Sequence, residues 1–201
     1  MRPPSRRDGG RPGDARRPFP ATEGERLSRF LAYVLRHHPE EAGLTLDDQA
    51  FADVDELLAA IHTRSGLQNV TREQVLDLVN EQGAPRFELL GNRVRARYGH
   101  SLPQRVRYEP ADPPADLFHG TEPQAAGEIL AAGLNPVQRQ YVHLSIDMPA
   151  AREVGRRRCE EPAVLRIDTA CAAKAGVRFY HAGPAVWLSD PIPPECIVRA
   201  E

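Results

Sequence analysis

Hydrophobic residues near the start of the chain recur with the period of an α-helix. They stand at i, i+3, i+4, i+7 and i+8 and so share one face over three turns: Leu27, Phe30, Leu31, Val34 and Leu35. Thr22 followed by Glu25 is the pattern of a capping box. Pro39 ends the run, because the residue before a proline disfavours helical backbone. The pattern predicts a helix between Thr22 and Pro39.

Two further helices and a hairpin are predicted after this helix. Asp53 with Glu56 opens "VDELLAAI", and Thr71 with Gln74 opens "REQVLDLVNEQG", which Gly83 closes. In "RFELLGNRVRARY", apolar and polar residues alternate on both sides of a Gly-Asn pair, which is typical of a β-hairpin. Three short helices followed by a hairpin are the ingredients of a winged-helix module.

The returning strand of the hairpin carries arginines on one face. Side chains alternate with period two along a strand, so these arginines lie opposite to Val94 and Ala96. With one arginine of the outgoing strand they predict a compact cationic surface made of Arg86, Arg93, Arg95 and Arg97. Such a face is most often simply solvated. Four arginines with no lysine among them favour phosphate binding, since the guanidinium fork matches phosphate geometry.

The pattern changes in the second half of the chain. The Pro-rich stretch 101–115, "SLPQRVRYEPADPPA", is predicted to be a linker. Beyond it, strands are predicted at "DLFHGT", "YVHLSI", "AVLRID", "VRFYHA", "AVWLS" and "CIVRA", and helices at "EPQAAGEILAAGL" and "MPAAREVGRRR". This mixture indicates an α+β fold. No G-x-G-x-x-G or P-loop motif is present, so the familiar dinucleotide and phosphate cradles are absent from the sequence.

Composition narrows the class of protein. The 201 residues are 41% apolar and 27% charged with a net charge of −2, which is ordinary for a soluble globular protein. Residues 1–22 are rich in Arg, Pro and Gly and are expected to form a disordered basic tail rather than an export signal. No apolar run approaches the roughly 20 residues of a membrane span. The chain has three cysteines far apart in sequence, Cys159, Cys171 and Cys196, so neither a disulfide framework nor a zinc site is expected. A cytoplasmic location is therefore expected.

The helix end "VLRHHPE" is the first candidate site. It is expected to leave Arg36 and His37 at an exposed C-terminal rim. Basic groups are favourable there because the helix dipole is negative, so one interpretation is a simple cap and the other is phosphate handling. His37 and His38 are adjacent on the helix and cannot chelate one ion together, and no H-E-x-x-H occurs, so no metal site is expected.

Two histidines in strand-like apolar runs are the second candidate site. His119 in "FHGT" and His143 in "VHLS" each need a partner or a function, because a lone polar residue is costly to bury. The residues that follow them leave room for a ligand: Gly120, Thr121 and Ser145. Arg139 precedes the second strand, so anion binding near the pair is predicted. Two ordinary core histidines are the alternative interpretation.

Several blocks of the chain together resemble the RNA 2'-phosphotransferases (tRNA 2'-phosphotransferase, KptA-like). In the family's order from about Arg26 onward, they are "RLSRFLAYVLRHHPEEAGLTLDDQAFADVDELL", "GAPRFELL", "RVRARYGHS", "LFHGT", "GLNPVQRQYVHLS", "EVGRRR" and "AVWLSDPIPPECI". The chain departs from the family in Tyr98, where Gln is usual, and in "DDQAFAD", where an aromatic-acidic turn is usual. These departures concern RNA contact rather than the chemistry.

The resemblance implies an N-terminal winged-helix-like lobe, 23–100, and a C-terminal ADP-ribosyltransferase-type lobe, 116–201, that binds NAD. It implies a catalytic set of Arg36, His37, Arg86 and Arg139. By the same resemblance, the NAD pocket is lined by His119, Gly120, Thr121, His143 and Ser145.

The implied reaction has two steps. The RNA 2'-phosphate first attacks C1'' of the nicotinamide ribose and expels nicotinamide. O2'' then attacks the phosphorus, which releases RNA with a free 2'-OH and ADP-ribose 1'',2''-cyclic phosphate. The arginines suit charge neutralisation on the phosphate oxygens, and His37 suits proton delivery to the leaving 2'-oxygen.

Two other functions stay open. A mono-ADP-ribosyltransferase acting on nucleic-acid ends or protein would stop after the first step. Transferases that modify proteins generally carry a late Glu in an E-x-E or Q-x-E loop, whereas "GPAVWLSD" has Val186 and no Glu. A non-catalytic RNA-binding regulator is disfavoured because all four Arg and His positions are retained. RNA carrying an internal 2'-phosphate and NAD are the expected partners, and a monomer is expected.

Overall fold

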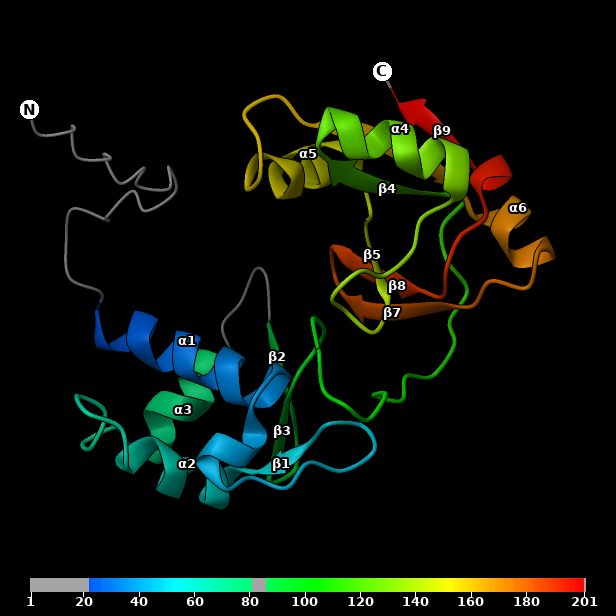
Figure 1. Cartoon of the computed structure of the whole chain (residues 1–201). Coiled ribbons are helices and arrows are strands. Elements are labelled where there is room, and N and C mark those ends of the chain that lie inside the picture. The colour runs from blue at the N-terminus through cyan, green and yellow to red at the C-terminus, as the bar shows by residue number, and fades with distance from the viewer. Residues whose placement is uncertain (1–21, 81–85, 201) are drawn as a thin grey trace, which may run out of the picture.

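The computed structural model describes residues 22–80 and 86–200, and two β-sheets organise them (Figure 1). A three-stranded sheet belongs to the first half of the chain and a six-stranded sheet to the second. The protein therefore has the mixed α+β architecture that the sequence predicts. The predicted basic tail, apart from Thr22, and the predicted helix end at Gly83 lie outside the described residues.

Three helices and a small antiparallel sheet form the first half. Its elements are α1 (Glu23–Arg36), η1 (Pro39–Ala42), β1 (Ala52–Asp53), α2 (Val54–His62), α3 (Arg72–Val79), β2 (Phe87–Leu90) and β3 (Arg93–Ala96), with strand order β1-β3-β2. The capping boxes predicted at Thr22 and Thr71 are confirmed. Asp53 caps α2 by accepting the N–H groups of Asp55 and Glu56. Strand β1 was not predicted, because two residues are too few to show an alternation.

The apolar face of α1 forms the core of this half. Leu31, Val34 and Leu35 are fully buried and pack in one cluster with residues of α2, α3 and the sheet. Burying each such side chain contributes roughly 1.5–3 kcal/mol. The predicted hairpin is confirmed, since β2 and β3 pair in register and their inward side chains, Val94 among them, are buried.

An antiparallel sheet of six strands forms the second half, with α5 packed on β4 and α4 in contact with β6 and β9 (Figure 1). Its order is β7-β8-β5-β4-β6-β9, and neighbouring strands run antiparallel. The elements are β4 (Asp116–Thr121), α4 (Pro123–Ala132), β5 (Val142–Ser145), α5 (Met148–Arg156), β6 (Ala163–Asp168), α6 (Thr169–Lys174), β7 (Phe179–Gly183), β8 (Val186–Ser189), η2 (Pro194–Cys196) and β9 (Ile197–Ala200). The six predicted strands and two predicted helices are confirmed. Helix α6 was missed because six residues are too few to show a helical period.

Cys171 and Cys196 form a disulfide, so the prediction of no disulfide was wrong. Helix α6 carries the first cysteine and η2 the second, and their Cα atoms lie 5.4 Å apart although 25 residues separate them in sequence. The spacing of cysteines along a chain does not show which of them the fold brings together. Cys159 is a free, half-buried thiol.

The segment predicted as a linker contains no helix or strand, but it is packed rather than loose. Val106 and Tyr108 are buried, and the Tyr108 ring packs edge-on against Tyr141 at 5.4 Å between centroids. The same cluster includes Ala50 of the first half and Leu188 of the second. This layer joins the two cores and fixes how they face each other. Within the two described ranges, none of the helices has the length and apolar character needed to cross a bilayer.

Candidate active site

The end of α1 directs Arg36 toward the interior, not toward the exposed rim that the sequence predicted. The Nε and Nη2 atoms of Arg36 are buried and have no hydrogen-bond partner in the described part of the chain. Its guanidinium carbon lies 5.4 Å from the centroid of the Tyr98 ring. A buried donor without a partner costs about 1–3 kcal/mol, and more when it is charged. A cap on the helix end does not account for this position, whereas an anionic ligand would.

His37 follows Arg36 and is held by residues far away in sequence. Its Nδ1 lies 2.7 Å from Oγ of Ser101, and its Nε2 lies 3.3 Å from Nη1 of Arg139. Ser101 also donates its backbone N–H to the carbonyl of Arg36 at 3.0 Å. Partial burial, followed by the charges of Arg139, Arg36 and His38, lowers the pKa of His37 below 6.5. The imidazole is therefore neutral at pH 7 in the free protein.

The adjacent histidine, His38, belongs to a different environment. Its Nδ1 lies 3.1 Å from a carboxylate oxygen of Glu40, and its ring packs on Tyr33 at 4.8 Å between centroids. The rings of His37 and His38 are 6.4 Å apart. Among the described residues, no group of three or more His, Cys, Asp or Glu could hold a metal ion.

Gly99 contacts arginines from both halves of the protein. It has φ of +89°, and a Cβ atom there would lie 3.6 Å from Cδ of Arg36. Its carbonyl accepts a hydrogen bond from Nη1 of Arg139. The backbone of residues 99–101 is thus the hub that brings Arg36, His37 and Arg139 together. Gly99 and Ser101 lie in "RVRARYGHS", one of the blocks that resemble the family, but they were not predicted as site residues.

Arg86 lies near this cluster without joining it. It donates a hydrogen bond to Oγ of Ser28, about two turns before Arg36 along α1. Its charge is one of the causes that lower the pKa of Arg36, after burial. Three of the four predicted catalytic residues therefore share one cluster, and the fourth stands at its edge.

The compact cationic surface predicted on the hairpin is wrong for two of its four arginines. Arg93 forms an ion pair with Asp47 at 2.8 Å, and Arg95 forms one with Glu88 at 2.7 Å. Carboxylates across this face therefore neutralise much of its charge. The register pairs Glu88 directly with Arg95, so alternation alone could have revealed that pair, but it could not reveal Asp47.

The two strand histidines lie side by side on β4 and β5. His119 donates its Nδ1–H to the carbonyl of His143 at 3.0 Å, and Nδ1 of His143 lies 3.0 Å from the carbonyl of Tyr141. These bonds leave each Nε2 as an acceptor. Burial lowers the pKa of both histidines, that of His143 to about 4, so both are neutral at pH 7.

Tyr98 connects the two predicted sites. Its ring meets the His143 ring edge-on at 6.1 Å between centroids, and it also lies beneath the guanidinium of Arg36. The Arg36–His37 cluster and the histidine pair are therefore linked through a single aromatic ring. The sequence indicated Tyr98 only as a departure from the family, and it did not predict that this ring contacts both sites.

The small and hydroxyl residues near the histidines have different roles. Thr121 and Ser145 are each 7% exposed, on β4 and β5. Gly120 is packed against α5, because a Cβ atom there would lie 1.8 Å from the carbonyl oxygen of Ala151. The absence of a side chain at Gly120 therefore lets helix α5 pack closely against β4. It does not make room for a ligand, although the sequence predicted this.

Replacing Gly120 with alanine should destabilise the protein by at least about 2 kcal/mol, because backbone must move to admit the methyl group. In a chain of this length that corresponds to a fall in Tm of roughly 4–8 °C, measurable by circular dichroism. Gly127→Ala on α4 is the matched control, since a Cβ atom there meets nothing within 4 Å. A Gly120→Ala variant as stable as the control would show that α5 does not pack this closely.

His100 is the buried polar residue of the hub. Its Nδ1 lies 3.0 Å from the Tyr108 hydroxyl, which itself donates to the carbonyl of Arg97. His100 must therefore donate from Nδ1, which leaves Nε2 as a buried acceptor with no partner in the described ranges. Burial, followed by the charges of Arg36 and Arg95, lowers the pKa of His100 to about 3.

This buried histidine should make the protein sensitive to acid. The unfolded chain binds a proton at His100 near pH 6.5, but the folded chain does so only near pH 3. The free energy of unfolding should therefore fall as the pH drops between these values, by up to about 1.4 kcal/mol per pH unit from this group. Urea unfolding at pH 7 and pH 5 measures the loss. It should shrink in His100→Gln and persist in the control His181→Gln, a residue exposed on β7. An equal loss in both variants would contradict the assignment.

The fold and this site define a mixed α+β protein with a basic, histidine-containing cluster, in which two nitrogens of Arg36 are buried. Comparison of the whole sequence gives the family. Residues 22–191 match the family described as RNA 2'-phosphotransferase, Tpt1 / KptA family. The chain belongs to this family, as its motifs predicted.

Relatives share this match over nearly their whole length. A protein of Thermococcus kodakarensis named "Probable RNA 2'-phosphotransferase" is 42% identical over 89% of this chain and 98% of its own. Proteins with the same name from Acetivibrio thermocellus and Bacillus thuringiensis are 38% and 39% identical, over 86% and 85% of this chain and 94% and 92% of their own.

Proposed function

We propose that the protein is an NAD-dependent RNA 2'-phosphotransferase that removes an internal 2'-phosphate from RNA of the tRNA splice-junction type. The observation that carries the proposal is the buried guanidinium of Arg36 beside His37 and Arg139, whose Nε and Nη2 have no hydrogen-bond partner among residues 22–80 and 86–200. A phosphate dianion would supply acceptors to these groups and offset their charges. Membership of the family supports phosphate on an RNA 2'-oxygen as that anion.

In this proposal each half of the protein holds one substrate. The three helices and the small sheet of the first half act as a winged-helix-like lobe for RNA. The six-stranded sheet acts as an ADP-ribosyltransferase-type lobe for NAD. The neutral acceptors of His119 and His143 and the buried hydroxyl residues Thr121 and Ser145 fit an uncharged amide and ribose hydroxyls. NAD, when bound there, supplies an electrophilic ribose carbon and a neighbouring hydroxyl group.

The chain's own residues then hold charge and move a proton. Arg36 and Arg139 neutralise the charge of the phosphate oxygens. Arg86, which precedes β2, adds positive charge at the edge of the site. Bound phosphate opposes the cationic charges that lower the pKa of His37, and so raises that pKa toward neutrality. His37 thereby gains a proton together with the substrate, in position to protonate the leaving 2'-oxygen.

Incubation with NAD and an oligonucleotide that carries one internal 2'-phosphate tests this function. Loss of the phosphate with formation of the cyclic phosphate of ADP-ribose is the expected result. A stable ADP-ribosylated adduct would favour the mono-ADP-ribosyltransferase alternative, and no reaction would favour a non-catalytic RNA-binding protein. The same oligonucleotide with a free 2'-OH is the control for the requirement for phosphate.

Ser101→Ala should lower the rate of phosphate removal about tenfold, because it removes the 2.7 Å contact that orients the His37 ring. The effect should fall on kcat rather than on KM for RNA, and Ser101→Thr should restore part of the rate since it keeps a hydroxyl. Steady-state kinetics of the three proteins measures this. A rise in KM alone would instead make Ser101 an RNA contact.

A further inference from the structure

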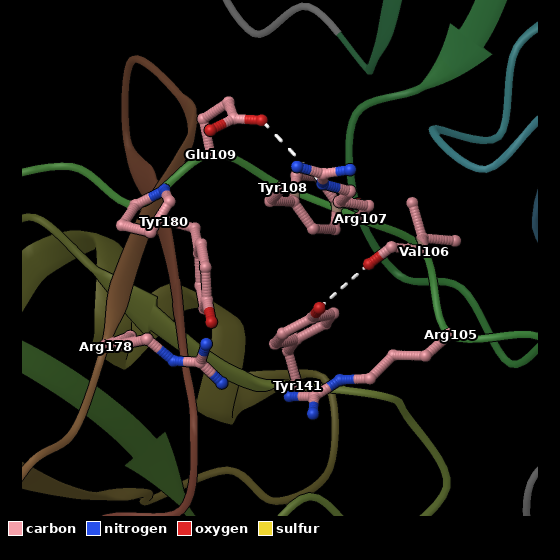
Figure 2. A pocket seen from close by; sticks show the side chains of 9 residues that line it. Arg105, Val106, Arg107, Tyr108, Glu109, Tyr141, Arg178 and Tyr180 are labelled. Atoms are coloured by element: carbon pink, nitrogen blue, oxygen red, sulfur yellow. Dashed lines mark hydrogen bonds and ion pairs between the residues drawn. The ribbon is translucent and has the colours of Figure 1, made fainter.

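A separate basic hollow of about 320 Å³ lies beside the proposed active site (Figure 2). Figure 2 shows it bounded by Tyr180 on one side and by Val106 and Tyr141 on the other. Arg107 stands at one end and Arg178 at the other. The volume is at the lower end of the range of small-ligand sites, roughly 300–1,000 Å³. None of its lining residues belongs to the predicted catalytic or NAD-binding sets.

The wall of the hollow is fastened to the segment that carries Arg139. Gln140 donates from Nε2 to the carbonyls of Leu102 and Gln104, both at 2.7 Å, and accepts the N–H of Val106 at 2.8 Å. Tyr141 donates its hydroxyl to the carbonyl of Val106 at 2.8 Å. Tyr141 follows Arg139 by two residues, which span at most about 7 Å. The hollow and the active site therefore keep a fixed and short separation.

Positive charge exceeds negative charge around the hollow. Arg105 and Arg178 share a single carboxylate, that of Asp190, at 2.6 and 2.9 Å. The Arg107 guanidinium lies 3.9 Å from a carboxylate oxygen of Glu109, and the Arg107 side chain is 69% exposed. An ion pair this long and this exposed is worth little, so Arg107 can turn to an incoming anion.

The tyrosines supply a stiff wall with few free polar groups. The rings of Tyr108, Tyr141 and Tyr180 pack against one another at 5.2–6.2 Å between centroids, and all three are buried. Their hydroxyls are directed to the carbonyls of Arg97 and Val106 and to Asp190. A ligand would therefore meet ring edges at the wall and guanidinium groups at the rim. A sugar–phosphate unit has this combination of an apolar sugar face and an anionic group.

We propose that this hollow binds a phosphodiester unit of the RNA strand, a few nucleotides from the 2'-phosphate. The proposal rests on the proposed function, since the active site would fix where the strand begins. A stacked strand advances about 3.4 Å per nucleotide, so a strand held at Arg139 reaches the hollow within a few steps. The site would position the strand without reading its sequence, as phosphate contacts generally do.

Arg107→Gln tests the proposal with two substrates, a 2'-phosphorylated dinucleotide and an oligonucleotide of about twelve residues with a central 2'-phosphate. The variant should raise KM for the longer RNA about three- to tenfold and leave KM for the dinucleotide unchanged. The slope of log Kd against log salt concentration for the longer RNA, measured without NAD, should become shallower by about 0.7. Arg199→Gln on β9, at the opposite edge of the sheet, is the matched charge control.

Glu109→Gln should have the opposite effect on RNA affinity from Arg107→Gln. It therefore distinguishes a loss of RNA binding from a loss of folding. Removing the carboxylate that faces Arg107 should lower KM for the longer RNA by about two- to threefold, which a misfolded variant cannot do. Unchanged affinity for long RNA in both variants, or equal effects on both substrate lengths, would overturn the proposal. A rise in KM for NAD instead would assign the hollow to the dinucleotide and also overturn it. Wild-type protein that leaves every 2'-phosphate in place would refute the proposed function, whereas RNA binding would still test the hollow.

Discussion

His37→Ala should slow the release of 2'-OH RNA by about 100- to 10,000-fold, while the Kd for 2'-phosphorylated RNA changes by less than about threefold. The imidazole is the titratable group placed between Ser101 and Arg139, and alanine leaves no proton donor there. Both arginines of the cluster remain in this variant, so we expect it still to bind the phosphate. Single-turnover kinetics with labelled phosphate, together with fluorescence anisotropy, measures rate and affinity separately.

His38→Ala is the matched control for this variant. The residue is the neighbour of His37 in sequence, but it is directed to Glu40 at 3.1 Å and lies outside the cluster. Its activity should stay within about twofold of wild type. If His37→Ala lost RNA affinity and rate in equal measure, the end of α1 would be a docking surface rather than a source of protons.

Arg139→Ala should accumulate ADP-ribosylated RNA and slow its conversion to products by about 100- to 1,000-fold. In the proposed mechanism the guanidinium contributes charge where the phosphorus is attacked, and in the structure it donates a hydrogen bond to the carbonyl of Gly99. The intermediate carries an extra ADP-ribose, so its mobility on a denaturing gel reports its amount. Gln138→Ala, an exposed residue of the same loop, should behave as wild type.

The same variant should also change the pH dependence of the reaction. The charge of Arg139 is the second cause, after burial, that lowers the pKa of His37, so its removal should raise that pKa. The fall in the second-step rate with increasing pH should then occur at higher pH than in wild type. Loss of NAD affinity with no accumulated intermediate and no such shift would show that Arg139 serves the nucleotide instead.

Local patterns in the sequence predicted most of the fold. The period of Leu27 to Leu35, the caps at Thr22 and Thr71 and the alternation along the hairpin are all properties of neighbouring residues, and the structure confirms them. Short elements were missed, because β1 and α6 have too few residues to display a period. The Cys171–Cys196 disulfide was missed since it depends on a tertiary contact.

The candidate site was less accessible to local reasoning. His37 and Arg139 are 102 residues apart, and only the family resemblance placed them together. Charge patterning alone misjudged Arg93 and Arg95, because their carboxylate partners come from other segments. The inward course of Arg36 could not be predicted either, since nothing in "LRHHP" indicates that Tyr98 lies beneath the guanidinium.

The tyrosine layer between the two cores has a consequence for how activity arises during folding. Each core is built from one uninterrupted stretch of chain, whereas Arg36 and Arg139 meet only after the layer around Tyr108 has closed. We therefore expect a nascent chain to be catalytically silent until both cores have docked. Substitutions that weaken the packing between the two cores should yield molecules with folded cores but no activity. Specific activity should therefore fall more than the circular-dichroism signal of secondary structure.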